Sequence, residues 1–265
     1  MTSNERRSLV RATRLHVEGL RALGVTTLPA PSTRPKTLPG SGLGAGGSGH
    51  VPQTDPQPGA LSPEPRGVVG DSSKEARLAA LAEAVQRCRR CPLYRTRTHA
   101  VISDGSPHAR LVFVGEAPGR DEDLKGVPFV GVAGVLLTKM IEAMGLRRES
   151  VYICNVLKDR PPANRTPLPE EVEACLPFLE EQLSIIRPRV ICTLGAVAAR
   201  ALLGPHVAIT KIRGEVREYH GIALVPTFHP AYLLRNPPAK KFAWVDLKKV
   251  KALLEEGEGR RAKGE

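Results

Sequence analysis

Four short polar loops carry the side chains that are best suited to chemistry. Each follows an apolar run of the chain: GEAPG begins at Gly115, NVLKD at Asn155, LGAVA at Leu194 and FHPAYLL at Phe228. Between them they hold carboxylate, amide and imidazole groups, which can recognise a polar substrate or move a proton. The sequence therefore predicts a functional site wherever these loops meet.

Cysteines form a second group of reactive side chains. Cys88 and Cys91 make a C-x-x-C turn, and Cys175 follows much later in the chain. The N-terminus lacks a secretory signal and no apolar run approaches the roughly 20 residues of a membrane helix, so we expect a cytoplasmic, nucleoid-associated protein. Stable disulfides are uncommon there, which favours metal binding or buried thiols for the five cysteines.

Alternating strands and helices must position the loops. Apolar runs at 109–115, 151–157, 190–195 and 223–230 are typical of buried strands, and amphipathic helices are expected at 72–88, 133–146, 166–188 and 242–257, with a further helix directly after 190–195. This alternation predicts an α/β fold in three layers, αβα, around a mainly parallel four-stranded sheet. Loops at the carboxyl ends of parallel strands share one edge, where such folds bind ligands.

The charge of the chain favours an anionic partner. Its formal net charge is +12, and nucleic acid is the leading candidate because neutralising phosphates releases counterions. Residues 1–70 hold eight Lys/Arg against four Asp/Glu and are rich in Pro, Gly and Ser. We predict a disordered basic extension there, of unknown partner, and a folded domain over 71–265.

Three of the loops resemble the signature stretches of the family 4 uracil-DNA glycosylases. The similarity is carried, in order, by GEAPGRDEDLKGVPFVGVAGVLL, by the asparagine in VYICNVLKDRPPANRTP, and by FHPAYLLRNP. It implies the glycosylase fold and a monofunctional enzyme of base excision repair. Such an enzyme hydrolyses the N-glycosidic bond of uracil in DNA and leaves an abasic site. We expect it to act on uracil-containing DNA as a monomer.

The resemblance gives three residues a place around an extruded base. Phe129 is suited to stack on the flipped uracil, although a phenylalanine in such a loop is often an ordinary core residue. Asn155 can read the O4/N3 edge and reject cytosine. His229, as a neutral imidazole, can donate a hydrogen bond to O2 and stabilise the charge on the leaving base.

Glu116 is the carboxylate of these loops best suited to position water or steady the sugar cation, although the resemblance does not settle which group activates the water. Asp121 and Asp123 compete with it for that role. Backbone amides of GEAPG would also bind uracil O2, with Ala117 standing where the family commonly has glycine; the contact survives unless that residue needs a positive φ.

A base-flipping loop needs an apolar wedge beside a basic residue. In FHPAYLLRNP the resemblance implies that Leu233 or Leu234 fills the vacated stack. Arg235 would then bind the DNA backbone.

Four cysteines hold a [4Fe–4S] cluster in family 4. Three of them match Cys88, Cys91 and Cys175, and the fourth lies four residues after the pocket asparagine. The fourth position here is Asp159. An oxygen ligand is harder than a thiolate, so the resemblance implies a more labile cluster. An external ligand or Cys154 are the alternatives for the fourth ligand. Zinc is the alternative for the metal, and a chain without a cluster is a further alternative.

Two other classes of function compete with the enzyme. One is a non-catalytic iron–sulfur module that binds DNA, for which Glu116, Phe129, Asn155 and His229 together would be unnecessary. The other is a nucleotide-binding α/β protein in which GEAPG cradles phosphate. The absence of Lys-Ser/Thr after that loop argues against a P-loop.

Overall fold

The computed structural model describes residues 73–261, with side chains as far as Glu256. The predicted extension over 1–70 lies outside the described residues. In the described part of the chain, no helix is both long enough and apolar enough to cross a membrane.

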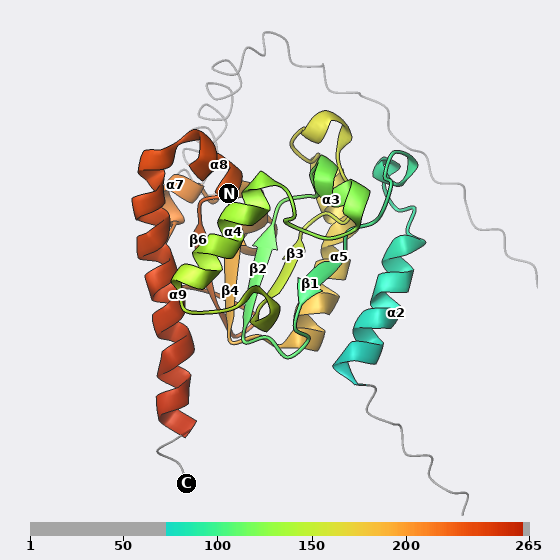
Figure 1. The fold of residues 1–265 in the computed structure, drawn as a ribbon. Helices are drawn as coiled ribbons and strands as arrows, with labels where there is room; N and C mark the ends of the chain where they lie inside the picture. Colours follow the sequence, from blue (N-terminus) through green and yellow to red (C-terminus); the bar gives the residue numbers. More distant parts are fainter. Residues whose placement is uncertain (1–72, 262–265) are drawn as a thin grey trace, which may run out of the picture. The chain divides into compact units, whose positions relative to one another are not determined.

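A six-stranded mixed sheet forms the middle layer (Figure 1). Its order is β1-β3-β2-β4-β6-β5. The four central strands are parallel to one another, and the two edge strands run antiparallel to their neighbours. The strands are β1 (Ser103–Gly105), β2 (Leu111–Gly115), β3 (Tyr152–Asn155), β4 (Val190–Leu194), β5 (Arg217–Tyr219) and β6 (Ile222–Thr227).

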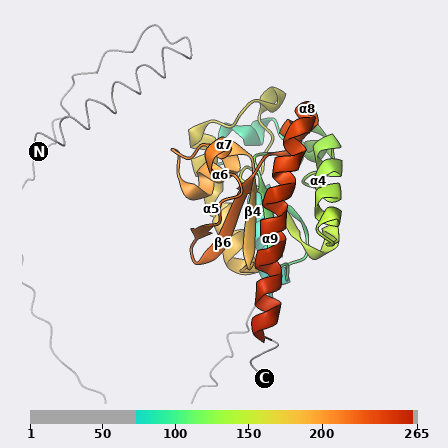
Figure 2. The same ribbon diagram turned by 90° about the vertical axis from the view of Figure 1, so that its left-hand side faces the viewer.

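Helices cover both faces of the sheet, which gives the predicted αβα sandwich (Figures 1 and 2). The α-helices are α2 (Lys74–Gln86), α3 (Arg120–Lys125), α4 (Val132–Ala143), α5 (Pro169–Ile186), α6 (Ala196–Leu203), α7 (Ile209–Ile212), α8 (Pro230–Arg235) and α9 (Lys240–Arg261). Short 3₁₀ turns are η1 (Pro92–Arg95), η2 (Arg148–Ser150), η3 (Pro162–Asn164) and η4 (Pro237–Ala239).

The alternation of side chains along each strand divides the core into two layers. On β2, Phe113 packs with α4 and α9, whereas Val112 and Val114 pack with α5 and α6 on the opposite face. All five residues of β2 and of β4 are buried, as expected for strands covered on both faces. Helix α2 packs on α5, and Ser73 caps it by accepting a hydrogen bond from the Ala76 amide at 3.2 Å.

The predicted fold class is confirmed, and the sheet has two strands more than the predicted four. Both additions, β1 and β5, are three-residue edge strands, too short to produce a clear alternating pattern. Two six-residue helices, α3 and α8, also follow strand-end loops. Figure 1 shows both at the end of the sheet where the parallel strands terminate.

Candidate active site

A cavity of about 580 Å³ opens at the carboxyl ends of the parallel strands. Its walls come from the loops after β2, β3 and β6, together with the starts of α3 and α4. The register pairs Gly115 with Asn155 directly across β2 and β3, so these two loops leave the sheet side by side. The predicted pocket residues Glu116, Ala117, Phe129, Asn155 and His229 all line this cavity.

The phenylalanine ring and the asparagine amide converge over Gly115. A Cβ atom at Gly115 would lie 2.2 Å from Asn155 Oδ1 and 2.5 Å from Phe129 Cζ, so a side chain there would collide with both. Phe129 itself has φ 54°, a left-handed conformation that is costly for a bulky residue. Its backbone also sits against Gly134, where a Cβ would meet the Phe129 carbonyl carbon at 2.1 Å. Two glycines therefore hold the ring in a strained position against the cavity.

The Asn155 amide is buried and has a free acceptor. Its side chain is 1% exposed, and Oδ1 has no hydrogen-bond partner among the described residues. Its backbone is fixed by Lys158 Nζ, which donates to the Asn155 carbonyl at 2.6 Å. A buried polar atom left unpaired costs roughly 1–3 kcal/mol. Its retention in the cavity wall indicates a ligand that donates a hydrogen bond at this point.

His229 is held as a neutral donor. Its Nδ1 accepts a hydrogen bond from the Ala231 amide at 3.1 Å and so caps α8, which places the ring proton on Nε2. Burial, assisted by the charge of Arg235, lowers the pKa of His229 to about 4. The ring lies 5.7 Å from the Phe129 ring, centroid to centroid. An imidazole with a fixed Nε2–H therefore faces the same cavity as the aromatic ring.

Glu116 is the carboxylate that suits proton transfer best. Burial raises its pKa, and its side chain makes no hydrogen bond or ion pair with other described residues. Asp123 does not line the cavity; it is buried and accepts hydrogen bonds from the Thr98 amide and hydroxyl at 2.8 and 2.9 Å. Asp121 lines the cavity but is exposed on the first turn of α3. The geometry thus favours Glu116 over its two competitors.

Glu122 is a cavity residue that the sequence did not reveal. Its carboxylate accepts hydrogen bonds from the amides of Gly119, Val130 and Gly131 at 3.1, 2.9 and 2.9 Å. It thereby joins the GEAPG loop to the loop that carries Phe129. The only signal was its position three residues after Gly119, the spacing of a helix cap.

Ala117 and α8 settle two questions that the sequence left open. Ala117 is not among the residues with positive φ, so the alanine is compatible with the local backbone. On α8, Leu233 is 1% exposed and belongs to the core, whereas Leu234 is 39% exposed. Of the two leucines, Leu234 is thus the one that faces outward, while Leu233 is packed in the core. Arg235 lines the rim of the cavity.

The three predicted cysteine ligands line a second, much smaller cavity. Cys88 follows α2, Cys91 precedes η1 and Cys175 lies on α5; all are free thiols. Cys154 is fully buried and does not line this cavity. No three or more His, Cys, Asp and Glu side chains in the described range converge closely enough to hold a metal ion. The three thiols would instead suit a group with several iron atoms, such as an iron–sulfur cluster, which cysteine thiolates hold.

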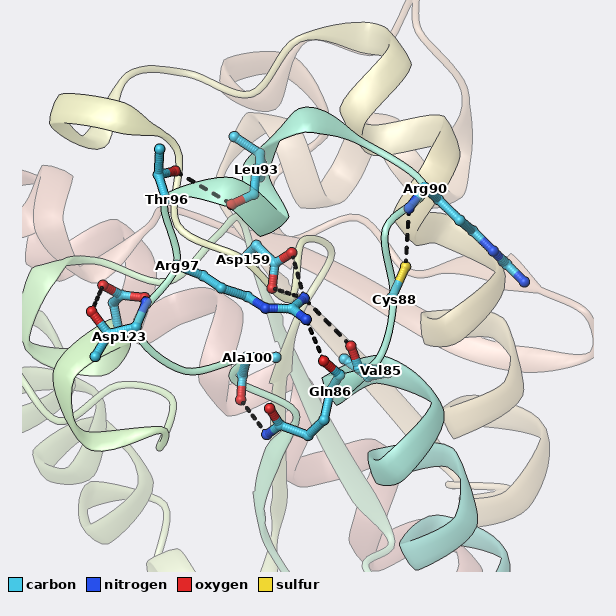
Figure 3. A network of polar contacts seen from close by, with 11 residues as sticks. Val85, Gln86, Cys88, Arg90, Leu93, Thr96, Arg97, Ala100, Asp123 and Asp159 are labelled. Carbon is cyan, nitrogen blue, oxygen red and sulfur yellow. Dashed lines mark hydrogen bonds and ion pairs between the residues drawn. The ribbon is translucent and has the colours of Figure 1, made fainter.

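Asp159 also lines the small cavity, but its carboxylate is already paired with an arginine (Figure 3). Arg97 Nη1 lies 3.0 Å from both Asp159 oxygens, and the two side chains are 12% and 5% exposed. The guanidinium also donates to the Gln86 carbonyl and, at 3.5 Å, to that of Val85. It therefore ties the end of α2, next to the C-x-x-C turn, to the loop after β3.

A buried lysine completes the wall of the cysteine cavity. Lys158 is 1% exposed and donates only to neutral oxygens: the Asn155 carbonyl and, at 2.5 Å, Gln182 Oε1. An ammonium without a carboxylate partner is costly to bury. Burial lowers the pKa of Lys158 and raises the pKa of the Cys91 and Cys175 thiols, so the charged form of each is disfavoured alone. An anionic, thiolate-bound group would compensate a positive charge on Lys158. The same set fits Asp159 poorly as a ligand, because its oxygens already accept from Arg97.

Comparison with known proteins agrees with this geometry. Residues 102–248 match the model of the uracil DNA glycosylase superfamily, and the chain belongs to that superfamily. It is 47% identical over 186 residues to the type-4 uracil-DNA glycosylase of Thermotoga maritima, covering 69% of this chain and 97% of that protein. The corresponding Archaeoglobus fulgidus protein is 46% identical over 64% of this chain and 89% of its own length. A type-5 uracil-DNA glycosylase of Pyrobaculum aerophilum is 32% identical over 60% and 78%. The chain is thus a uracil-DNA glycosylase of the type-4 group.

Proposed function

We propose that this protein hydrolyses the N-glycosidic bond of uracil in DNA, with Asn155, Phe129, His229 and Glu116 as the working residues of the cavity. The observation that carries the proposal is the buried, unpartnered Asn155 Oδ1. It lies in a cavity of about 580 Å³ that is also lined by an aromatic ring, a neutral imidazole and a carboxylate of raised pKa.

Recognition begins when the uracil nucleotide leaves the DNA stack. The base stacks on Phe129, and Asn155 Oδ1 accepts the uracil N3–H while the amide nitrogen donates to O4. Cytosine carries an acceptor at N3 and a donor at C4, the reverse of this pattern. The Asn155 amide therefore rejects cytosine, because an acceptor would face an acceptor across a buried contact.

Bond cleavage separates the base as an anion from a cation-like sugar. His229 donates its Nε2–H to uracil O2 and stabilises the negative charge that develops on the base. The Glu116 carboxylate, without a protein partner, orients a water molecule toward C1′ and takes its proton as the C1′–O bond forms and the C1′–N1 bond breaks. The uracil anion then takes a proton from solvent, and an abasic site remains.

The DNA-facing end of α8 supports the extruded state. Leu234, the exposed leucine of the pair, fills the space vacated by the base, and Arg235 binds the adjacent backbone. One chain supplies all of these residues, so the site needs no second copy, and we propose that the protein acts as a monomer. The +8 charge of the chain beyond residue 70 favours binding of the phosphates.

The cysteine cavity is proposed to hold a [4Fe–4S] cluster through Cys88, Cys91 and Cys175. Support comes from the three free thiols, the nearby Lys158 side chain and the type-4 relatives. The predicted oxygen ligation by Asp159 requires its carboxylate to leave Arg97; otherwise the fourth position is open to an external ligand. Held by these three thiols, a cluster would join the turn after α2 to α5, and glycosidic hydrolysis needs no redox step.

The function is tested with a fluorescein-labelled oligonucleotide that contains one uracil. Excess purified protein should produce a single alkali-labile site at the uracil, in single-stranded DNA and in a U:G duplex. The matched oligonucleotide with thymine at the same position should stay intact. If the uracil strand also survives alkali treatment after prolonged incubation, the proposal fails. The same result would favour a module that only binds DNA.

A further inference from the structure

We propose that a surface formed by α8, η4 and the start of α9 binds the unpaired DNA strand that flanks the target nucleotide. This proposal rests on the proposed function and extends its DNA contact beyond the α8 wedge. We call it the α8–α9 surface and define it by its outward side chains: Tyr232, Leu234, Arg235, Lys240, Lys241 and Phe242.

Apolar and cationic side chains are both exposed on this surface. Tyr232, Leu234 and Phe242 are 38%, 39% and 45% exposed, although large apolar side chains are usually buried. Arg235, Lys240 and Lys241 are exposed between them. Rings that offer free faces beside cations are what proteins use to bind single strands, because bases stack on the rings while cations contact phosphates.

Ring and cation contacts connect the surface to the cavity without a break. Tyr232 lines the cavity, and its ring lies 4.9 Å from that of Phe228, centroid to centroid. The Arg213 guanidinium carbon lies 5.5 Å from the Phe228 ring centroid and 5.3 Å from that of Phe242. Lys241 Nζ lies 5.1 Å from the same Phe242 centroid. A row of rings joined by the Arg213 guanidinium therefore runs from the cavity to Phe242, and a strand that leaves the cavity can follow it.

Hydrogen bonds hold Arg213, the side chain between the Phe228 and Phe242 rings, in place. Arg213 Nε donates to Asp246 Oδ2 at 3.0 Å, and its Nη2 donates to the Phe242 carbonyl at 2.6 Å. Asp246 is fully buried and also accepts a hydrogen bond from Thr227 Oγ1 at 2.7 Å, two residues before His229. The platform is thus anchored to the strand that delivers the imidazole, and little side-chain entropy is lost when a base stacks on it.

The charge of this segment also selects a polyanion. Between residues 228 and 249 the one acidic side chain is Asp246, which is buried and paired with Arg213. Every outward charge in that segment is positive: Arg235, Lys240, Lys241, Lys248 and Lys249. In a duplex the base faces are covered by their neighbours, so the exposed ring of Phe242 favours an unpaired flank.

The test uses three single-stranded oligonucleotides that carry a tetrahydrofuran abasic analogue. The short one has two nucleotides on each side of the analogue. The two extended ones have ten nucleotides on the 5′ side or on the 3′ side, and two on the other. Wild-type protein should bind one of the two extended single strands more tightly than the short one. Phe242→Ala should remove that gain, which corresponds to about 5- to 100-fold in Kd. Phe242→Leu should not restore it, since leucine keeps apolar volume but offers no ring to stack on. Melting temperatures of both variants confirm that α9 stays folded.

Charge is tested with a matched pair of lysines. Lys241→Ala should lower the salt slope of single-strand binding by about 0.7, the value for one phosphate contact. Lys251→Ala, ten residues further along the same helix and on another face, should leave the slope unchanged. The proposal is overturned if Phe242→Ala retains full affinity for both extended strands, or if the two lysine variants behave alike. Excision of uracil from a short oligonucleotide reports the proposed function separately and should be unaffected in Phe242→Ala.

Discussion

Replacing His229 separates its two roles, because each role uses a different ring atom. Nδ1 accepts the Ala231 amide and caps α8, whereas Nε2–H faces the cavity. His229→Ala removes both atoms. In His229→Asn the amide oxygen stands where Nδ1 was and can still cap the helix, but no donor reaches the position of Nε2.

The expected magnitudes follow from these two roles. Loss of one donor to a developing anion costs about 10²- to 10³-fold in rate. Loss of a helix cap costs about 1 kcal/mol, or roughly 2–4 °C in melting temperature for a domain of this size. His229→Ala should show both losses. His229→Asn should show the loss of rate with a near-wild-type melting temperature.

The assay is single-turnover excision from a uracil oligonucleotide at saturating enzyme, repeated between pH 4.5 and 8. The pKa of His229 is lowered to about 4, so the ring is neutral over this range and produces no change of rate near pH 6.5. Because the unfolded ring binds a proton below about pH 6.5, this residue should make stability rise with pH between 4 and 6.5. A rate that falls with a midpoint near 6.5, and loses that dependence in His229→Asn, would refute a neutral donor.

Four further predictions concern the cavity, the cysteine site and residues 1–70. Asn155→Asp should abolish most uracil excision without loss of fold, as measured by alkali cleavage and circular dichroism, because a carboxylate cannot donate to O4. The excision rate should fall on the acid side with a midpoint above that of an ordinary glutamate, since burial raises the pKa of Glu116, and Glu116→Gln should be slow at every pH. Asp159→Cys should make the brown chromophore of anaerobically purified protein bleach more slowly in air, as followed by visible absorbance. Deletion of residues 1–70 should leave the saturated excision rate unchanged and weaken DNA binding modestly at low salt, as a binding titration would show.

Much of the cavity could be predicted because its parts follow long apolar strands. Once the runs that end at Gly115 and Asn155 are recognised as neighbouring parallel strands, their loops must meet at one edge. The neutral state of His229 also followed from its expected role. The choice between Leu233 and Leu234 did not, since it depends on the rotation of a helix of only six residues.

Contacts between distant segments could not be predicted from the sequence. Arg97 and Asp159 are separated by 62 positions, and no local pattern marks them as partners. The sequence therefore suggested Asp159 as a free ligand, whereas the structure pairs it with a guanidinium. The strained backbone of Phe129 was equally hidden, because its cause is close packing against Gly115 and Gly134 rather than the residues beside it.

The two short edge strands affect how the protein behaves at high concentration. An open edge of a sheet exposes unpaired amides and carbonyls, onto which a strand of another molecule can add. Here β1 and β5 offer only three residues each, and β5 presents the exposed charges of Arg217 and Glu218. Sheets of two molecules therefore gain little by joining edge to edge. A largely parallel sheet, which forms slowly and passes through aggregation-prone states, is protected in this way once it has folded.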